Sequence, residues 1–211
     1  MADVKWTGVA VFGSVLCTAL AAAVTALPAQ AAPGVGQTTP TAWGGCDNFV
    51  SDAYLPTAVC TTVPVPIDEA DPTGPQAHLA VIKIPARGNR LGVLLMNPGG
   101  PGASAVDSVV NLYDSLSDSP VTEHFDLVGF DPRGVGHSTP ELRCRTDAEH
   151  DAWRREPMVD YSQAGVAAIE QLNRSFAQKC LERMGKSFLA GVGTASAAKD
   201  MDAVRAALGE D

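Results

Sequence analysis

A short loop rich in glycine and proline is the strongest candidate for chemistry in this sequence. It reads Asn-Pro-Gly-Gly-Pro-Gly at residues 97–102 and directly follows an apolar run at residues 91–96. Three glycines and two prolines favour a rigid turn with few side chains, so that backbone N–H groups point outward. Preorganised N–H groups can stabilise a developing oxyanion, and the loss of one such donor typically costs about 2.7–4 kcal/mol. The loop therefore predicts an oxyanion site built from backbone amides.

Two other interpretations of residues 97–102 stay open. Glycine loops also bind phosphate, but this loop matches neither Gly-x-x-x-x-Gly-Lys-Ser/Thr nor Gly-x-Gly-x-x-Gly. A turn with a purely structural role is the second alternative. We favour the oxyanion interpretation, because a loop after a buried parallel strand lies at the sheet edge where open α/β sheets bind ligands.

The loop is predicted to lie between two parallel strands. Apolar runs at residues 91–96 and 125–130 are typical of strands covered on both faces. Residues 103–116, between them, carry apolar side chains at helical spacing. A strand, a helix and a second strand form a βαβ unit with parallel strands. We therefore expect an α/β fold in which residues 131–138 form a second glycine-rich loop beside the first.

The rest of the chain is predicted to add strands before this unit and helices after it. Residues 60–67 are β-prone but interrupted by prolines, which favours an edge strand, and residues 78–84 form the next strand. Helices are expected at residues 162–184 and 195–208. One face of the first of these helices contains Val166, Ile169, Phe176 and Cys180. A βαβ pattern would require another strand after the second helix, and the sequence ends at residue 211.

The two loops together resemble a known family. Residues 97–102 resemble the His-Gly-Gly-Pro-Gly loop of α/β-hydrolase aminopeptidases. Residues 130–138, Phe-Asp-Pro-Arg-Gly-Val-Gly-His-Ser, resemble the Asp-x-Arg-Gly-x-Gly-x-Ser segment that follows the next strand there. Further matching residues are Trp43, Cys46, Cys60, Asp200, Asp202, Val204, Arg205, Leu208, Gly209 and Glu210. From about residue 43 to residue 211, the chain is similar to secreted tripeptidyl aminopeptidases and proline iminopeptidase-like enzymes of actinomycetes.

The resemblance implies that the chain is the amino-terminal portion of an α/β-hydrolase fold, with an incomplete, mostly parallel sheet flanked by helices. It also implies a serine peptidase that releases residues or tripeptides from the amino termini of peptides. The oxyanion donor would lie in the Gly99–Gly100 turn, at Gly100 in preference to Gly99, with Asn97 helping to organise the loop. Pro98 stands where proline iminopeptidases carry His, which alters side-chain contacts but leaves the backbone donors in place.

Two charged residues of the second loop are predicted to organise the site. Asp131 and Arg133 match the charged positions of the family motif and would brace the loop beside the active site. The simplest role for them is a local ion pair that takes no part in the chemistry.

No catalytic nucleophile is found in the sequence. The Gly-x-Ser-x-Gly elbow does not occur, since the motifs around Ser104 and Ser138 both lack the second glycine. In this fold the triad runs Ser, Asp or Glu, then His. His137 precedes any such serine and is expected to be a loop residue, as are His78, His124 and His150. We expect the nucleophile, the acid, the triad histidine and the region that recognises the substrate amine after Asp211. The 211-residue chain alone is therefore predicted to be inactive.

The amino-terminal segment predicts export. Residues 1–31 have Lys5, a mostly apolar run and a final Ala-Gln-Ala, as a cleaved signal peptide has. A retained membrane anchor is the alternative. Residues 32–42 are predicted to be a flexible lead-in, and residues 43–211 to be the hydrolase portion, secreted and without stable membrane insertion.

Four cysteines remain after cleavage at residue 31: Cys46, Cys60, Cys144 and Cys180. An even number in an exported chain predicts two disulfides with three alternative pairings. The neighbouring pairing, Cys46 with Cys60 and Cys144 with Cys180, is the simplest; four free thiols are the alternative.

Composition excludes several partners. The formal net charge of -9, without a basic cluster, argues against nucleic acid. No spacing resembles a zinc or haem site, and no cofactor is expected; the expected partner is a peptide substrate. Two alternatives to the hydrolase fragment stay open: a non-catalytic exported binding module on a hydrolase-like scaffold, and assembly with a separate polypeptide that carries the triad.

Overall fold

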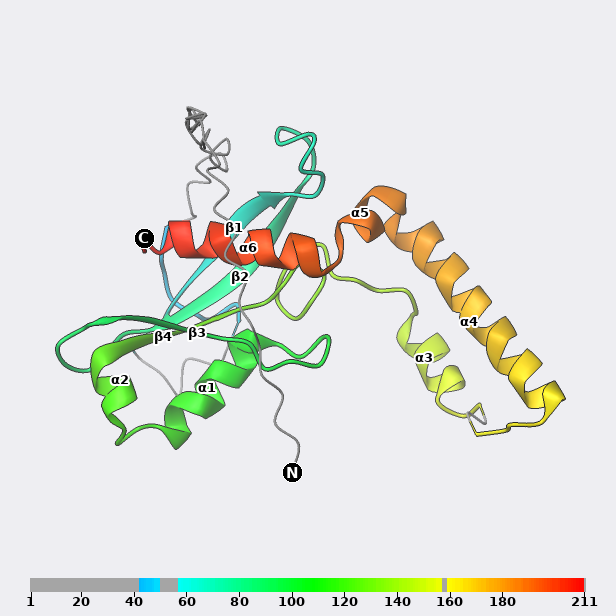
Figure 1. Cartoon of the computed structure of the whole chain (residues 1–211), viewed down its shortest axis with the longest axis horizontal. Helices are drawn as coiled ribbons and strands as arrows, with labels where there is room; N and C mark the ends of the chain where they lie inside the picture. Colours follow the sequence, from blue (N-terminus) through cyan, green and yellow to red (C-terminus); the bar gives the residue numbers. More distant parts are fainter. Residues whose placement is uncertain (1–41, 50–56, 157–158, 211) are drawn as a thin grey trace, which may run out of the picture. The chain divides into compact units, whose positions relative to one another are not determined.

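The computed structural model describes residues 42–49, 57–156 and 159–210, which belong to one structural unit (Figure 1). The predicted signal peptide, residues 1–31, and almost all of the lead-in lie outside the described residues. Within the described ranges, no helix has the length and apolar character needed to cross a membrane.

A four-stranded mixed sheet forms the centre of the fold. Its strands are β1 (Val59–Pro66), β2 (Gln76–Ile84), β3 (Gly92–Met96) and β4 (Phe125–Phe130), and they lie in the order β1-β2-β4-β3. β2 is antiparallel to both of its neighbours, whereas β3 and β4 are parallel, with Leu94 opposite Leu127. The predicted parallel βαβ unit is therefore present. β1 is an edge strand, as its prolines predicted, because proline cannot donate to a second neighbour.

Two helices cover opposite faces of the sheet (Figure 1). α1 (Ala105–Ser115) and α6 (Thr194–Ala207) correspond to two of the three predicted helices. Successive residues of a strand point to opposite faces, so Ile82 packs with α1 while Val81 packs with α6. The helix residues buried against the sheet are Val106 and Val109 in α1 and Ala203 and Val204 in α6. These contacts place the core on both sides of β2 and β4.

β3 corrects the prediction of two strands covered on both faces. Residues 126–130 of β4 are buried, but every residue of β3 is at least partly exposed, and Leu94 is 42% exposed. Within the described residues, β4 has a neighbouring strand on each side, whereas β3 pairs only with β4. The apolar sequence of β3 is therefore only partly covered.

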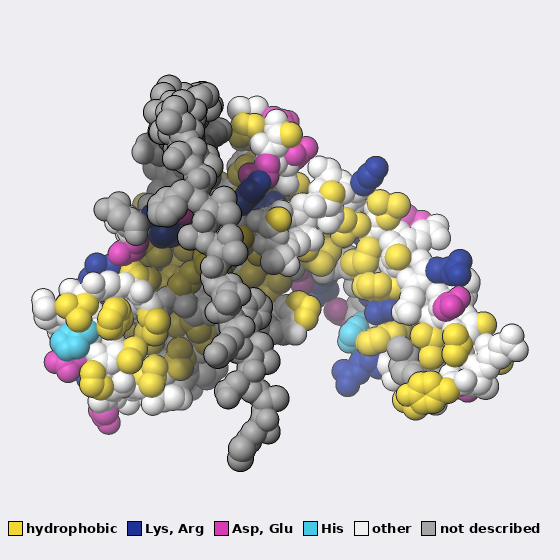
Figure 2. Space-filling view, in the orientation of Figure 1, with side chains coloured by type: hydrophobic (Ala, Val, Ile, Leu, Met, Phe, Trp, Pro, Cys, Tyr) yellow, Lys and Arg dark blue, Asp and Glu magenta, His cyan; other side chains and the backbone are white. Residues whose placement is uncertain are grey.

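Residues 147–191 form what we call the helical arm. It consists of α3 (Asp147–Trp153), α4 (Gln163–Met184) and α5 (Lys186–Gly191). The sequence predicted α4 but not α3, α5 or the short α2 (Pro120–His124). α4 leaves much of its predicted apolar face uncovered, since Val166 is 46% and Phe176 is 37% exposed. Hydrophobic side chains are visible over the arm in Figure 2.

A disulfide and an ionic cluster hold α3 to α4. Cys144 is bonded to Cys180. Glu149 accepts hydrogen bonds from Lys179 Nζ at 2.7 Å and Arg183 Nη1 at 2.6 Å. These cations lower the pKa of the Glu149 carboxyl, with Arg183 contributing most. The second disulfide joins Cys46 to Cys60 at the start of the sheet, so the structure contains the neighbouring pairing.

Candidate functional site

The glycine loop, residues 97–102, leaves the carboxyl end of β3 in a conformation that only glycine adopts readily. Gly99, Gly100 and Gly102 have positive φ angles of 83°, 125° and 97°. At Gly100, a Cβ atom would also lie 2.9 Å from the backbone nitrogen of Gly102. The glycines are thus required by the backbone path.

The two amides predicted as oxyanion donors differ in their hydrogen bonds. The Gly99 N–H donates to Asn97 Oδ1 at 2.9 Å, so the Asn97 side chain closes the start of the loop. The Gly100 N–H has no acceptor among the described residues. The two amides therefore differ, since the Asn97 side chain occupies the Gly99 N–H alone among the described contacts.

A cleft of about 550 Å³ lies beside the glycine loop. Three segments line it: the loop and Ala103, residues 132–135 after β4, and residues 192–197 at the start of α6. Since β3 and β4 are parallel, the first two segments meet at the carboxyl edge of the sheet. Ligands bind at this edge in open α/β sheets.

Asp131, the first residue after β4, ties the second loop to the start of α1. Its buried carboxylate accepts hydrogen bonds from the backbone N–H groups of Ala105 at 2.7 Å and Val106 at 3.2 Å through Oδ1. Its Oδ2 accepts from the His137 N–H at 2.8 Å and the Ser104 hydroxyl at 3.1 Å. A carboxylate at a helix N-terminus is also favoured by the helix dipole. Because α1 follows the glycine loop directly, Asp131 fixes where that loop ends.

Arg133 corrects the prediction of a local ion pair with Asp131. Its guanidinium instead makes two hydrogen bonds to Asp200 of α6, from Nε at 2.8 Å and from Nη2 at 2.6 Å. A third bond runs from Nη1 to the Ile67 carbonyl at 3.2 Å. The hydrogen bonds to Asp200 raise the pKa of Arg133 above its ordinary value. Both side chains are buried, at 2% and 1% exposure.

Asp200 is the residue of the site that sequence reasoning missed. The sequence places it among the residues that match the family and indicates no partner for it. An acidic residue three positions before the buried face of Ala203 and Val204 is the signal that could have revealed a buried charge. Its partner, 67 positions away along the chain, could not be read from local spacing.

The serines of the two motifs that lack the second glycine, Ser104 and Ser138, both have structural hydrogen bonds. Ser104 is the N-cap of α1 and accepts from the Asp107 N–H. The buried Ser138 hydroxyl donates to the Asp131 carbonyl at 2.6 Å and accepts from the Ala80 N–H at 2.9 Å. Neither hydroxyl is paired with a histidine side chain by any contact among the described residues.

The four histidines lie on different elements. His137 lies in the second loop, with Nε2 3.1 Å from Asp107 Oδ1. His78, His124 and His150 belong to β2, α2 and α3, which corrects the expectation that they are loop residues. Among the residues that the structure describes, no cluster of histidine, cysteine and acidic side chains could hold a metal ion.

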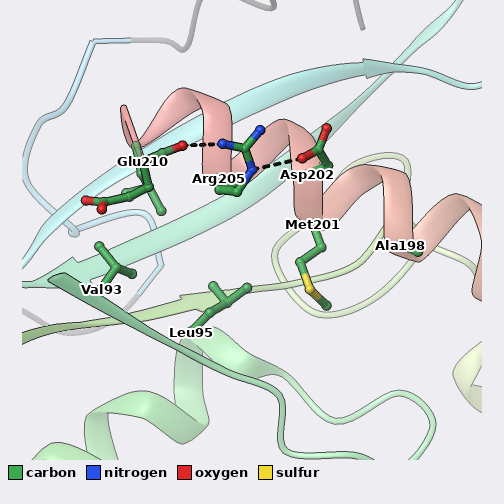
Figure 3. A pocket seen from close by; sticks show the side chains of 8 residues that line it. Val93, Leu95, Ala198, Met201, Asp202, Arg205 and Glu210 are labelled. Atoms are coloured by element: carbon green, nitrogen blue, oxygen red, sulfur yellow. Dashed lines mark hydrogen bonds and ion pairs between the residues drawn. The ribbon is translucent and has the colours of Figure 1, made fainter. Parts of the chain in front are cut away.

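A second hollow, of about 520 Å³, lies between β3 and α6 (Figure 3). Val93 and Leu95 of β3 face Met201 of α6 across it (Figure 3), and Leu208 also lines it. Arg205 on its rim donates to Asp202 Oδ1 at 2.9 Å and to the Glu210 carbonyl. The hollow thus presents an apolar floor along the edge of β3 that has no paired strand in the described part of the chain.

Comparisons with known proteins agree with this geometry. A family model described as the alpha/beta hydrolase fold matches residues 92–211. Carboxylesterase B of Mycobacterium tuberculosis is 58% identical over 183 residues, which cover 83% of this chain and 35% of the relative. Serine protease Hip1 of the same species is 46% identical, covering 86% of this chain and 35% of the relative.

A third relative comes from a different genus. Tripeptidyl aminopeptidase of Streptomyces lividans is 39% identical over 173 residues, 80% of this chain and 31% of the relative. The chain spans about a third of the length of the curated relatives it matches.

Proposed function

Because this chain belongs to the alpha/beta hydrolase fold family, we propose that it forms the first part of the catalytic domain of an exported serine hydrolase. In this proposal the reaction is acyl transfer: a serine hydroxyl attacks a carbonyl carbon, and water then hydrolyses the acyl-enzyme. The chain contributes the oxyanion site, and the catalytic serine, acid and histidine are contributed by sequence that follows residue 211.

The observation that carries this proposal is the Gly100 amide. Its N–H has no acceptor among the described residues, and it lies on a glycine loop that lines the 550 Å³ cleft. A tetrahedral intermediate places its negative oxygen where such a donor can reach it. Gly99 contributes indirectly in this proposal, since its N–H holds the loop through Asn97.

The edge of β3 that has no neighbouring strand among the described residues supports the proposed position of the nucleophile. A strand that follows α6 and pairs parallel to β3 would place apolar side chains on the floor formed by Val93 and Leu95. Its carboxyl end would then lie at the same sheet edge as the glycine loop, because parallel strands end on the same side. A serine at a sharp turn after that strand would face Gly100.

The substrate class rests on the relatives. We propose peptides with a free amino terminus, from which the enzyme releases single residues or tripeptides. The name of the Streptomyces relative, tripeptidyl aminopeptidase, supports the release of tripeptides. Carboxylic esters are the second candidate, favoured by the name of the 58% identical relative. Both substrates pass through the same oxyanion intermediate.

Export is supported by the two disulfides, which form and persist in oxidising compartments. Residues 1–31 would supply the signal peptide in this proposal, and the mature protein would act outside the cytoplasm without a membrane anchor.

The test is to express the complete reading frame and the 211-residue chain side by side. Each is assayed with tripeptide and aminoacyl p-nitroanilides, with p-nitrophenyl esters, and with a fluorophosphonate probe that labels activated serines. We expect the complete protein to be labelled and to turn over substrate, and the 211-residue chain to show neither property. Replacing the serine of the first Gly-x-Ser-x-Gly after residue 211 by alanine serves as the control and should abolish labelling.

Three results would argue against the proposal. Turnover by the 211-residue chain would show that the nucleophile lies within it. A complete protein that folds but is not labelled would favour the non-catalytic binding module. A reading frame that ends without the elbow, with labelling only after a second polypeptide is added, would favour a two-chain enzyme.

A further inference from the structure

We infer that Asp200 and Arg133 form a buried clamp that positions the glycine loop relative to α6, and that Asp200 is thereby a positioning residue for turnover. This inference rests on the proposed function and adds to it a residue on α6, far along the chain from both loops. Neither residue of the clamp is proposed to contact the reacting atoms.

The clamp has the geometry of an orienting contact. Arg133 and Asp200 make two nearly parallel hydrogen bonds, at 2.8 Å and 2.6 Å, with both side chains almost fully buried. A bidentate guanidinium–carboxylate pair fixes direction as well as distance. A third bond, from Arg133 Nη1 to the Ile67 carbonyl, prevents the guanidinium from rotating. The pair therefore sets the position of α6 on the second loop.

The end of the helical arm packs closely against the clamp. A Cβ atom at Gly191 would lie 3.3 Å from Arg133 Nη1 and 2.7 Å from the Ile67 carbonyl oxygen. Only glycine permits this approach. The residues immediately after Gly191, from 192 to 197, line the same cleft as the glycine loop, and Arg133 also lines it. The clamp therefore lies at the wall of the cleft.

Short stretches of backbone and the contacts of Asp131 and Gly136 connect the clamp to the glycine loop. Arg133 lies two residues after Asp131, which binds the first N–H groups of α1. Gly136, in the same loop, approaches Ser104 so closely that a Cβ atom there would lie 3.1 Å from Ser104 Cβ. Ser104 follows the glycine loop by two residues. A shift of α6 would consequently be transmitted to the oxyanion donors.

We infer that the Arg133–Asp200 pair mainly fixes the relative position of the second loop and α6, and contributes less to the free energy of unfolding. Buried ion pairs can often be replaced by apolar side chains of similar size without loss of stability, because the cost of desolvating two charges offsets their attraction. Such a replacement keeps the packing but removes the directional bonds. It therefore separates a positioning role from a purely structural one.

Two variants of the complete protein test the clamp. Arg133→Lys keeps the positive charge beside Asp200 but cannot form the two-bond contact. The double variant Arg133→Met/Asp200→Leu removes both charges. A misplacement of about 1 Å at a catalytic group can cost about 100-fold in rate. We therefore expect kcat to fall about 10- to 100-fold in both variants, with KM changed less than about threefold and the melting temperature of the double variant close to that of wild type.

The matched control lies next to Asp200 on the same helix. Lys199 makes an exposed ion pair with Glu69 at 3.1 Å, so Lys199→Gln removes a charge from α6 without touching the clamp. Its kcat and melting temperature should stay at the wild-type values. A wild-type kcat in Arg133→Lys would overturn the inference. A double variant whose kcat and melting temperature both equal the wild-type values would overturn it as well.

Hydrogen exchange separates failure of the clamp from failure of the proposed function. If the complete wild-type protein shows neither turnover nor fluorophosphonate labelling, the proposed function is wrong. The clamp is then still measurable, because Arg133→Lys should speed exchange of the amides at residues 97–106 relative to wild type and Lys199→Gln. Unchanged exchange there would overturn the inference whatever the activity.

Discussion

Replacing Asp131 by asparagine tests how the second loop holds the start of α1. Asparagine has the same shape, but its amide nitrogen cannot accept a hydrogen bond. With the side-chain oxygen kept toward Ala105 and Val106, the nitrogen would face the His137 N–H, which now donates to Oδ2 at 2.8 Å. The substitution therefore removes one acceptor and the negative charge at the helix N-terminus.

The expected cost follows from these two losses. Leaving a buried donor without an acceptor costs about 1–3 kcal/mol. Loss of a partly buried charge at a helix N-terminus costs about 0.3–1 kcal/mol, and up to about 2 kcal/mol in favourable geometry. We predict that Asp131→Asn lowers the free energy of unfolding by about 2–4 kcal/mol. The amides of residues 104–106 and 137 should also exchange faster with solvent.

Asp107→Asn is the matched control for this prediction. Asp107 lies in the first turn of the same helix and makes the same change of charge, but its side chain is 60% exposed. Its loss should cost less than about 1 kcal/mol. Denaturant unfolding of the complete protein measures both variants. If the two substitutions cost the same, the buried Asp131 carboxylate does not hold the loop.

Three further predictions concern other contacts of the fold. Because the pKa of Glu149 is lowered, the ionised carboxyl stabilises the fold above the ordinary glutamate pKa, and this stabilisation is lost as the pH falls below that value. The difference in melting temperature between wild type and Glu149→Gln should therefore shrink from about pH 6 to about pH 3, and a constant difference would contradict this. Gly136→Ala places a Cβ atom 2.1 Å from Asp131 Oδ2 at a positive φ. In denaturant unfolding it should cost more than Gly185→Ala, where the φ is also positive but the space is open and backbone strain alone costs about 1–3 kcal/mol; equal costs would exclude the collision. Cys180→Ser opens a loop of 36 residues and should destabilise by about 4 kcal/mol in the chain-entropy model, measured as a melting-temperature shift absent under reducing conditions.

Much of the sheet could be predicted because each strand has a recognisable pattern within its own few residues. The apolar run of β4 and the prolines of β1 carry their structural consequences within a few residues. The apolar run of β3 predicted burial on both faces, and this prediction was wrong. An apolar run shows that a strand is suited to burial, but its actual exposure depends on which neighbours are present. Short helices such as α3 are specified mainly by a cap, here the capping box of Thr146 and Glu149, which the hydrophobic period does not reveal.

In the candidate site too, the local sequence predicted some features and not others. The glycine loop was recognisable because positive φ angles require glycine, and its place after a strand puts it at the ligand edge of the sheet. The pairing of Arg133 with Asp200 could not be recognised from the sequence, because the motif places Arg133 two residues from Asp131 and suggests a local pair. Folding instead turns the two side chains toward different helices, α1 and α6.

In the proposed function, the Gly100 amide receives the negative oxygen of an acyl-transfer intermediate. The most direct measurement is a crystal structure of the complete protein after reaction with a fluorophosphonate, whose phosphonyl oxygen mimics that oxygen. We predict this oxygen about 2.7–3.1 Å from the Gly100 nitrogen, with the Gly99 N–H still bonded to Asn97. A phosphonyl oxygen held by other donors, with the Gly100 N–H turned away from the cleft, would contradict the account.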